Sequence, residues 1–97
     1  MPRFELSARA WADLEAIADY GAGQWGQRQA AAYVSALQDR LRMLASRPQI
    51  GRARDDLVTG LRSIRFESHI VFYMPAGFGI HVARILHMRQ DAGRHID

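Results

Sequence analysis

Residues 61–87 read LRSIRFESHIVFYMPAGFGIHVARILH, and most of the expected sheet lies in this stretch. Three runs rich in Ile, Val and Phe, at residues 61–66, 69–74 and 80–87, have the composition of β-strands. Residues 75–79 (PAGFG) have the composition of a hairpin loop. The stretch therefore predicts a three-stranded antiparallel meander.

The residues before this meander predict one short strand and two helices. Residues 3–6 (RFEL) alternate polar and apolar side chains, which is typical of a strand. Residues 8–20 and 26–45 instead carry apolar side chains at helical spacing. Ser7 is placed to cap the first helix with its hydroxyl. A few Gly-rich residues join the helices, so we expect an antiparallel hairpin.

Each helix has an expected inward-facing stripe. In the first helix the stripe is Trp11, Leu14, Ile17 and Ala18. In the second helix it is Ala30, Tyr33, Leu37, Leu41 and Leu44. The aromatic side chains of the hairpin are expected to pack in the core or between the helices. Gly21 and Gly23 are expected to end the first helix.

Together these elements define an α+β fold of two layers, with the helices on one face of a mainly antiparallel sheet. The length of 97 residues predicts a single domain over residues 1–97. Residues 1–20 carry charges in place of a signal-peptide core, and the longest apolar run, residues 70–74, is far too short to span a membrane. We therefore expect a cytoplasmic protein without membrane association. The polar residues 88–97 are expected to fray.

The predicted strands carry apolar side chains on both faces. In the last strand Val82 and Leu86 alternate with Ala83 and Ile85. Because a helix hairpin covers one face of a sheet, the second apolar face requires a cover of its own. A bound partner is one possible cover, and residues 46–60 or a second copy of the chain are the alternatives.

Arginine supplies the positive charge of the chain. All 13 residues counted as Lys or Arg are Arg, and the net charge is +3. Clustered Arg side chains bind phosphates or carboxylates, although a single Arg is more often an ordinary surface charge. Arg84 lies in mid-strand between apolar neighbours, where an unpaired charge is costly. We expect a carboxylate partner for Arg84, from the chain itself or from a ligand.

The histidines do not form a metal-binding pattern. His81 and His87 are too far apart along one strand to chelate one ion, and no HxxH or HExxH spacing occurs. No metal and no cofactor are therefore expected. His87 follows the last strand, where it can act as a general acid or base or make a structural hydrogen bond.

The order and spacing of these features resemble the ParE toxin family over almost the whole chain. The hairpin carries the resemblance through residues 12–14 (ADL), Ile17, Tyr20, residues 25–26 (WG), residues 29–30 (QA), Tyr33 and Leu37. The entry to the sheet carries it through residues 48–52 (PQIGR) and 60–63 (GLRS). The last strands carry it through residues 69–73 (HIVFY) and, most distinctively, 84–91 (RILHMRQD).

This resemblance implies a toxin of a type II toxin–antitoxin module with the RelE/ParE fold. ParE toxins are understood to inhibit DNA gyrase by binding, without catalysis of their own. A ParD-like antitoxin neutralises the toxin, in a heterotetramer or larger complex because such antitoxins dimerise. The resemblance implies no direct nucleic-acid binding by the toxin alone.

The resemblance and the apolar sheet face together suggest two sets of binding residues. The antitoxin-binding set is Arg62, Arg65, Val71, Tyr73, Ile80, Val82, Arg84 and Leu86. The target-binding set, at and after the end of the last strand, is His87, Arg89, Gln90 and Arg94.

Two alternatives remain open. The first is a RelE-like, ribosome-dependent mRNA endonuclease, for which the catalytic candidates are Arg62, Arg65, Glu67, Arg84 and His87. The absence of Lys, and of any Tyr after Tyr73, departs from the usual RelE pattern. The second alternative is an inactive module that only binds an antitoxin.

Overall fold

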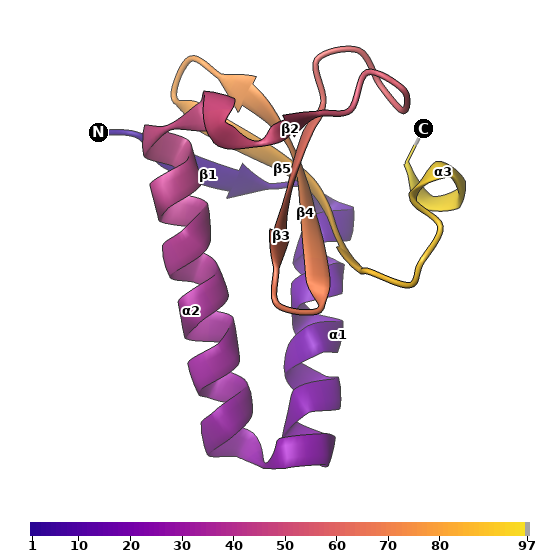
Figure 1. Cartoon of the computed structure of the whole chain (residues 1–97). Coiled ribbons are helices and arrows are strands. Elements are labelled where there is room, and N and C mark those ends of the chain that lie inside the picture. The colour runs from indigo at the N-terminus through magenta and orange to yellow at the C-terminus, as the bar shows by residue number, and fades with distance from the viewer. Residues whose placement is uncertain (97) are drawn as a thin grey trace.

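The computed structural model describes residues 1–96 and confirms the predicted α+β class (Figure 1). Its elements in chain order are β1 (Arg3–Leu6), α1 (Ala8–Trp25), α2 (Gln27–Ser46), a 3-10 turn η1 (Pro48–Ile50), β2 (Arg52–Ala53), β3 (Arg62–Phe66), β4 (His69–Ala76), β5 (Gly79–His87) and α3 (Ala92–His95). The strands form one sheet in the order β1-β5-β4-β3-β2. Strands β3, β4 and β5 are the predicted antiparallel meander.

Strand β1 lies at one edge of the sheet and runs parallel to β5. Arg3 is opposite Gly79, and a Cβ on Gly79 would collide with the backbone oxygen of Arg3. Gly79 also has a φ of 142°, a conformation that L side chains rarely adopt. Glycine at this position therefore lets the N-terminal strand join the last strand of the meander.

Helix α1 continues past the two glycines that were expected to end it. The helix ends at Trp25, and Gly26 with a φ of 88° makes the turn into α2. A Cβ on Gly21 would lie 3.1 Å from the Cβ of Ala30 and 3.1 Å from the Trp25 ring. Gly21 is therefore a contact point at which the two helices approach closely, and it does not break the helix.

The main core lies between the helix hairpin and one face of the sheet. Its buried residues are Ala10, Leu14, Leu37, Leu41, Leu44, Ala45, Phe66, Val71, Tyr73, Ile80, Val82 and Ile85. Helix α1 contributes Ala10 and Leu14, whereas Trp11 is 56% exposed and Tyr20 is 66% exposed. The expectation that Trp11 and Tyr20 are packed inside is wrong, because the inward stripe begins one residue earlier than Trp11.

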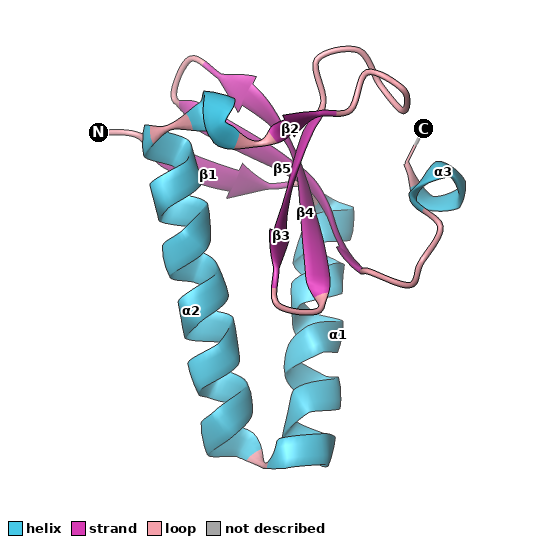
Figure 2. Ribbon diagram, viewed as in Figure 1, coloured by secondary structure: helices cyan, strands magenta, loops and turns pink. Residues whose placement is uncertain are grey.

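The second face of the sheet is covered by the chain itself. Leu61, Phe72 and Leu86 are buried there beneath Leu57, Val58, Ala92 and Ile96. Figure 2 shows the loop before β3 and helix α3 together on the side of the molecule away from α2. The expectation of an open apolar face is therefore wrong, and the alternative that residues 46–60 provide cover is confirmed in part.

Residues 88–96 supply the rest of that cover. Asp91 caps α3 by accepting a hydrogen bond from the backbone N–H of Gly93, and Ile96 packs against the second face. The expected fraying of this segment is wrong for residues 88–96. Within residues 1–96 no helix is long and apolar enough to cross a membrane.

Candidate functional site

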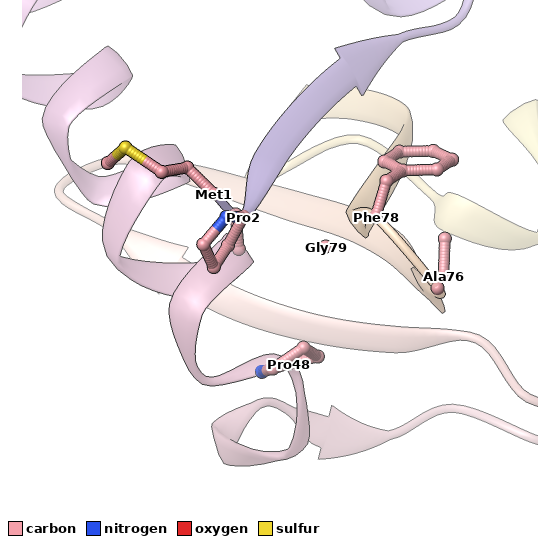
Figure 3. A pocket seen from close by; sticks show the side chains of 8 residues that line it. Met1, Pro2, Pro48, Ala76, Phe78 and Gly79 are labelled. Atoms are coloured by element: carbon pink, nitrogen blue, oxygen red, sulfur yellow. The ribbon is translucent and has the colours of Figure 1, made fainter.

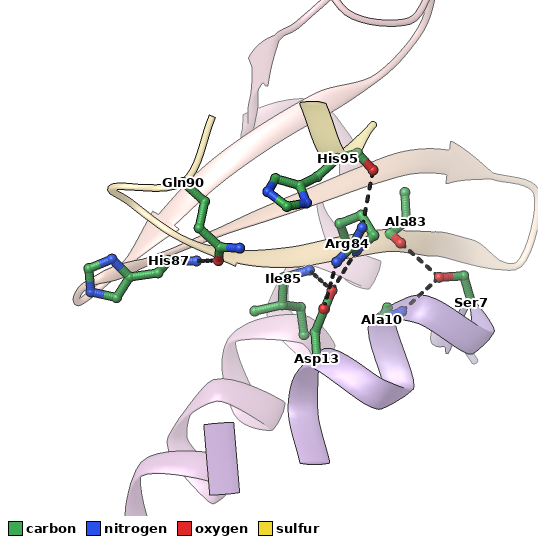
Figure 4. Close-up of polar contacts among 9 residues, drawn as sticks. All are labelled: Ser7, Ala10, Asp13, Ala83, Arg84, Ile85, His87, Gln90 and His95. Atoms are coloured by element: carbon green, nitrogen blue, oxygen red, sulfur yellow. Dashed lines mark hydrogen bonds and ion pairs between the residues drawn. The ribbon is translucent and has the colours of Figure 1, made fainter. Parts of the chain in front are cut away.

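Side chains at and near the start of α1 form hydrogen bonds with the backbone of β5 where this strand extends beyond β1. Strand β1 pairs with β5 only as far as Val82, so the backbone that follows lacks a strand on that side. Ser7 donates a hydrogen bond to the backbone oxygen of Ala83 at 2.7 Å, and Asp13 accepts one from the N–H of Ile85 at 2.9 Å. Figure 4 shows these side chains reaching from α1 to the strand.

Arg84 has the carboxylate partner that its position requires, and the partner is internal. Its Nε and Nη2 donate to the two Asp13 oxygens at 2.8 and 2.9 Å, while its Nη1 donates to the backbone oxygen of His95 at 3.1 Å. The hydrogen bond to Asp13 raises the pKa of Arg84. Arg84 therefore ties together α1, β5 and α3, and its guanidinium is already engaged (Figure 4).

The other charged candidates, Arg62, Arg65 and Glu67, do not join Arg84 in one cluster, and both arginines donate hydrogen bonds to backbone oxygens. Arg62 donates from Nη1 to the backbone oxygens of Gln49 and Gly51, at 3.2 and 2.5 Å, and so fixes the loop after α2. Arg65 is exposed and donates from Nε to the backbone oxygen of Glu67 at 2.8 Å. Glu67 lies in the β3–β4 turn with a φ of 52°. These residues do not converge with Arg84 on one catalytic centre.

The apolar members of the expected antitoxin-binding set do not form an open surface. Their side chains are at most 1% exposed: Val71, Tyr73, Ile80, Val82 and Leu86. The first four belong to the core under the helices, and Leu86 lies beneath the cover of the second face. The expectation that these residues face outward is corrected, because the fold itself supplies both covers.

The expected target-binding residues do form an accessible segment after β5. The backbone N–H of His87 donates to Oε1 of Gln90 at 2.7 Å, and the N–H of Arg89 donates to Nδ1 of His87 at 3.2 Å. Arg89, Gln90 and Arg94 are exposed, and His87 is half-buried. This tight turn holds His87 and Gln90 beside each other at the end of the sheet (Figure 4).

His87 and Gln90 also line a pocket between α1 and the adjoining ends of β4 and β5. Its volume is about 490 Å³, and we refer to it as the imidazole pocket. It is lined by Asp13, Ala16, Ile17, Tyr20, Trp25, Ser68, His69, Ile85, His87 and Gln90. Aromatic side chains thus form one part of the pocket, and polar groups from the sheet and the following turn form another.

His69 was not among the site residues expected from the sequence. It lies directly opposite His87 in the β4–β5 pairing, and the two ring centroids are 5.5 Å apart with nearly perpendicular planes. Nδ1 of His69 is 2.7 Å from the hydroxyl of Tyr33 on α2. Burial and the nearby His87 both lower the pKa of His69, and burial raises the pKa of Tyr33.

A second pocket near the N-terminus offers less chemistry. It lies between the end of α2 and the β4–β5 turn, where Met1, Pro2, Pro48 and Phe78 are among its lining residues (Figure 3). None of its lining side chains is ionisable. The imidazole pocket is therefore the better candidate binding site among the described residues.

Comparisons with known proteins agree with this architecture. A family model described as "ParE toxin of type II toxin-antitoxin system, parDE" matches residues 4–92. Toxin ParE1 of Caulobacter vibrioides is 38% identical over 96 residues, which cover 99% of each chain. Toxin ParE1 of Mycobacterium tuberculosis strain H37Rv is 41% identical over 95 residues, which cover 97% of each chain.

The solved structures give the same answer at the level of the fold. A chain of the chromosomal ParDE TA system from P. aeruginosa is similar with a TM-score of 0.75 and 25% sequence identity, over 90% of this chain and 96% of that one. These matches define the class of protein as a toxin of type II toxin–antitoxin systems. Within that class, the chain belongs to the ParE toxin family.

Proposed function

We propose that this toxin acts by binding DNA gyrase in the cytoplasm, without catalysis of its own, and that a ParD-like antitoxin neutralises it. The observation that carries the proposal is the engagement of the arginines that a nuclease would need. Transfer of a phosphoryl group requires cations free to hold the developing negative charge. Arg84 is held by Asp13, and Arg62 is held by backbone oxygens after α2.

The segment at and after the end of β5 supports the same proposal, because it presents accessible polar side chains. We assign contact with gyrase to His87, Arg89, Gln90 and Arg94. His87 accepts a hydrogen bond at Nδ1 within its own turn, and Arg94 lies 3.7 Å from Asp91. A binding surface needs accessible groups in fixed positions, and this turn provides them.

The antitoxin is proposed to contact the accessible charges and the helix side of the molecule. Among the expected residues, Arg65 is exposed and part of Arg62 remains accessible. The basic net charge of +3 favours an acidic antitoxin segment. The assembly is proposed to be a heterotetramer or larger, and light scattering of the purified complex measures its mass.

A plasmid supercoiling and cleavage assay tests the proposed target. Toxin freed from its antitoxin is added to gyrase from the same host, and the matched control is toxin saturated with antitoxin. We expect loss of supercoiling and accumulation of linear DNA with free toxin only. Growth arrest in cells with unaffected gyrase and cleaved ribosome-bound mRNA would contradict the proposal. Absence of any growth arrest would instead indicate an inactive module.

A further inference from the structure

The hydrogen bonds around His69 and His87 determine which ring nitrogen carries the proton. The backbone N–H of Arg89 donates to Nδ1 of His87 at 3.2 Å. The hydroxyl of Tyr33 lies 2.7 Å from Nδ1 of His69. In a neutral imidazole one nitrogen accepts and the other donates. An accepting Nδ1 therefore places the hydrogen on Nε2.

We assign Tyr33 as the donor in its contact with His69, because a neutral phenol has one hydrogen to donate. Burial raises the pKa of Tyr33, so the phenol keeps its hydrogen. Within residues 1–96 the one side-chain hydrogen-bond partner of the phenol is Nδ1 of His69. The hydrogen of Tyr33 is then directed to Nδ1 of His69. Both histidines thus carry their hydrogen on Nε2.

These Nε2–H groups are open to a ligand. Neither Nε2 has a hydrogen-bond partner within residues 1–96. Across the same residues no buried polar side-chain atom is left without a partner, so both Nε2 atoms are accessible from outside the fold. Gln90 uses its Oε1 to accept from the backbone of His87, which leaves its amide hydrogens available as well.

Asp13, the carboxylate among the residues that line the imidazole pocket, does not compete for these donors. Both carboxylate oxygens of Asp13 already accept hydrogen bonds from Arg84, and one of them also accepts from the backbone N–H of Ile85. The apolar lining comes from Ile17 and Ile85. Tyr20 and Trp25, which line the same pocket, are 66% and 46% exposed. The pocket therefore pairs an apolar and aromatic wall with a group of N–H donors.

We propose that the imidazole pocket binds a carboxylate side chain of the antitoxin, with Nε2–H of His69 and of His87 donating to its oxygens. This inference rests on the proposed function, because it names the chemistry of the antitoxin contact and extends that contact to His87, where a bound antitoxin would block a residue assigned to gyrase. A carboxylate accepts several hydrogen bonds, and hydrogen bonds to charged acceptors are the stronger ones. The exposed aromatic rings pack against the residues that flank the acidic side chain.

The charge distribution favours a carboxylate over a cationic ligand. The charge of Asp13 is balanced by Arg84, and Arg89 lies two residues after His87 in the chain. The chain as a whole carries a net charge of +3. Among the described residues that line the pocket, Asp13 is the one carboxylate, and Arg84 already engages both of its oxygens, so a cationic group would find no unpaired carboxylate there.

Nitrogen NMR of the imidazole rings tests the tautomers directly. Toxin labelled with ¹⁵N and freed from its antitoxin is examined by long-range ¹H–¹⁵N correlation. We expect His69 and His87 to show the pattern of a protonated Nε2 and an accepting Nδ1. Nδ1–H signals for both rings would overturn the inference, because the donors would then point back into the fold.

A pair of small probes tests the ligand chemistry without the antitoxin. We expect 4-phenylbutanoate to shift the Nε2–H signals of both histidines and to change the fluorescence of Trp25 in a Trp11→Phe background. The matched cation 4-phenylbutylamine is expected to leave these signals in place. Equal responses to both probes would overturn the proposal, because the pocket would then recognise only the aromatic body.

Two variants of His87 separate the donor from the ring. His87→Phe keeps an aromatic ring without the N–H, and His87→Gln keeps an N–H donor in a similar place. We expect His87→Phe to weaken the binding of both 4-phenylbutanoate and the antitoxin about tenfold or more, and His87→Gln to stay within about threefold of the wild type. Unchanged thermal unfolding of both variants establishes that they fold.

These experiments distinguish the failure of this inference from the failure of the proposed function. If the antitoxin binds wild type and His87→Phe equally well, the pocket inference is overturned and the antitoxin complex stands. If the ParD-like antitoxin does not bind wild-type toxin, the proposed partner is wrong. The 4-phenylbutanoate titration then decides the chemistry of the pocket independently.

Discussion

Asp13 connects the packing of α1 to the chemistry of the sheet edge. Its carboxylate accepts from Arg84 and from the backbone of Ile85, in a place where only 14% of the Asp13 side chain is exposed. An unpaired Arg84 would be a sheltered charge, and the N–H of Ile85 would lose its acceptor. This residue therefore contributes to stability and holds the wall of the imidazole pocket in place.

Replacement of Asp13 should be costly. We expect Asp13→Ala to lower the free energy of unfolding by about 2–3 kcal/mol, because it leaves Arg84 and the Ile85 N–H without their acceptor. Urea denaturation measures the change. The matched control is Asp39→Ala, which removes a pair with Arg42 whose side chains are 73% and 63% exposed. A similar loss of unfolding free energy in both variants would show that the partial burial of the Asp13–Arg84 pair does not increase its contribution to stability.

At the scale of elements, helix α1 shows why Gly21 does not end the helix as the sequence predicts. Glycine usually disfavours the interior of a helix, but the interhelix contact at Gly21 leaves little room for a side chain. Gly23 lies in the same helix, and a Cβ there would meet nothing within 4 Å. Glycine is therefore needed for close packing at Gly21 but not at Gly23. The sequence spacing alone does not distinguish the two positions.

Alanine substitutions should separate these two causes. We expect Gly23→Ala to raise the free energy of unfolding by about 0.5–1 kcal/mol, through the higher helix propensity of Ala. Gly21→Ala should not give this gain, because its Cβ would lie 3.1 Å from both Ala30 and Trp25. Thermal unfolding of the two variants measures the difference. Equal stabilisation would contradict the close helix contact.

Sequence patterns predicted the strands and helices well because each pattern is local. The meander follows from β-branched and aromatic runs, and Arg84 in mid-strand correctly required an acidic partner. The His69–His87 pair depends instead on a register shift in β4 and β5 between Phe72 and Tyr73. With the register of the hairpin end carried through unchanged, Ser68 would lie opposite His87. The pocket thus depends on one irregularity that composition does not reveal.

At the scale of the whole molecule, one sheet has a different cover on each face. The helix hairpin covers one face and extends beyond the sheet, which leaves Tyr20 and Trp25 exposed near its end (Figure 1). The other face is covered by short segments distant in sequence, through residues such as Leu57 and Ile96. The sequence left the cover by residues 46–60 as one alternative among three and did not predict the cover by residues 88–96, because each segment contributes only a few apolar side chains.

Weakening the cover supplied by residues 88–96 should expose the second face. We expect Ile96→Asp to lower the free energy of unfolding by about 1–2 kcal/mol, because the charge disfavours packing against the sheet. Binding of a hydrophobic dye should rise as Phe72 and Leu86 become accessible. Arg94→Ala is the matched control on α3, since 84% of the Arg94 side chain is exposed. Unchanged dye binding by Ile96→Asp would refute this role.

The place of β5 between β1 and β4 also has a consequence for synthesis on the ribosome. Strand β5, which lies between β1 and β4, is the last strand to be translated. Strand β1 therefore has no strand to pair with until residues 79–82 emerge from the ribosome. The helix hairpin forms from local contacts before that moment. A nascent chain therefore has neither the complete sheet nor the imidazole pocket until translation of β5 is finished.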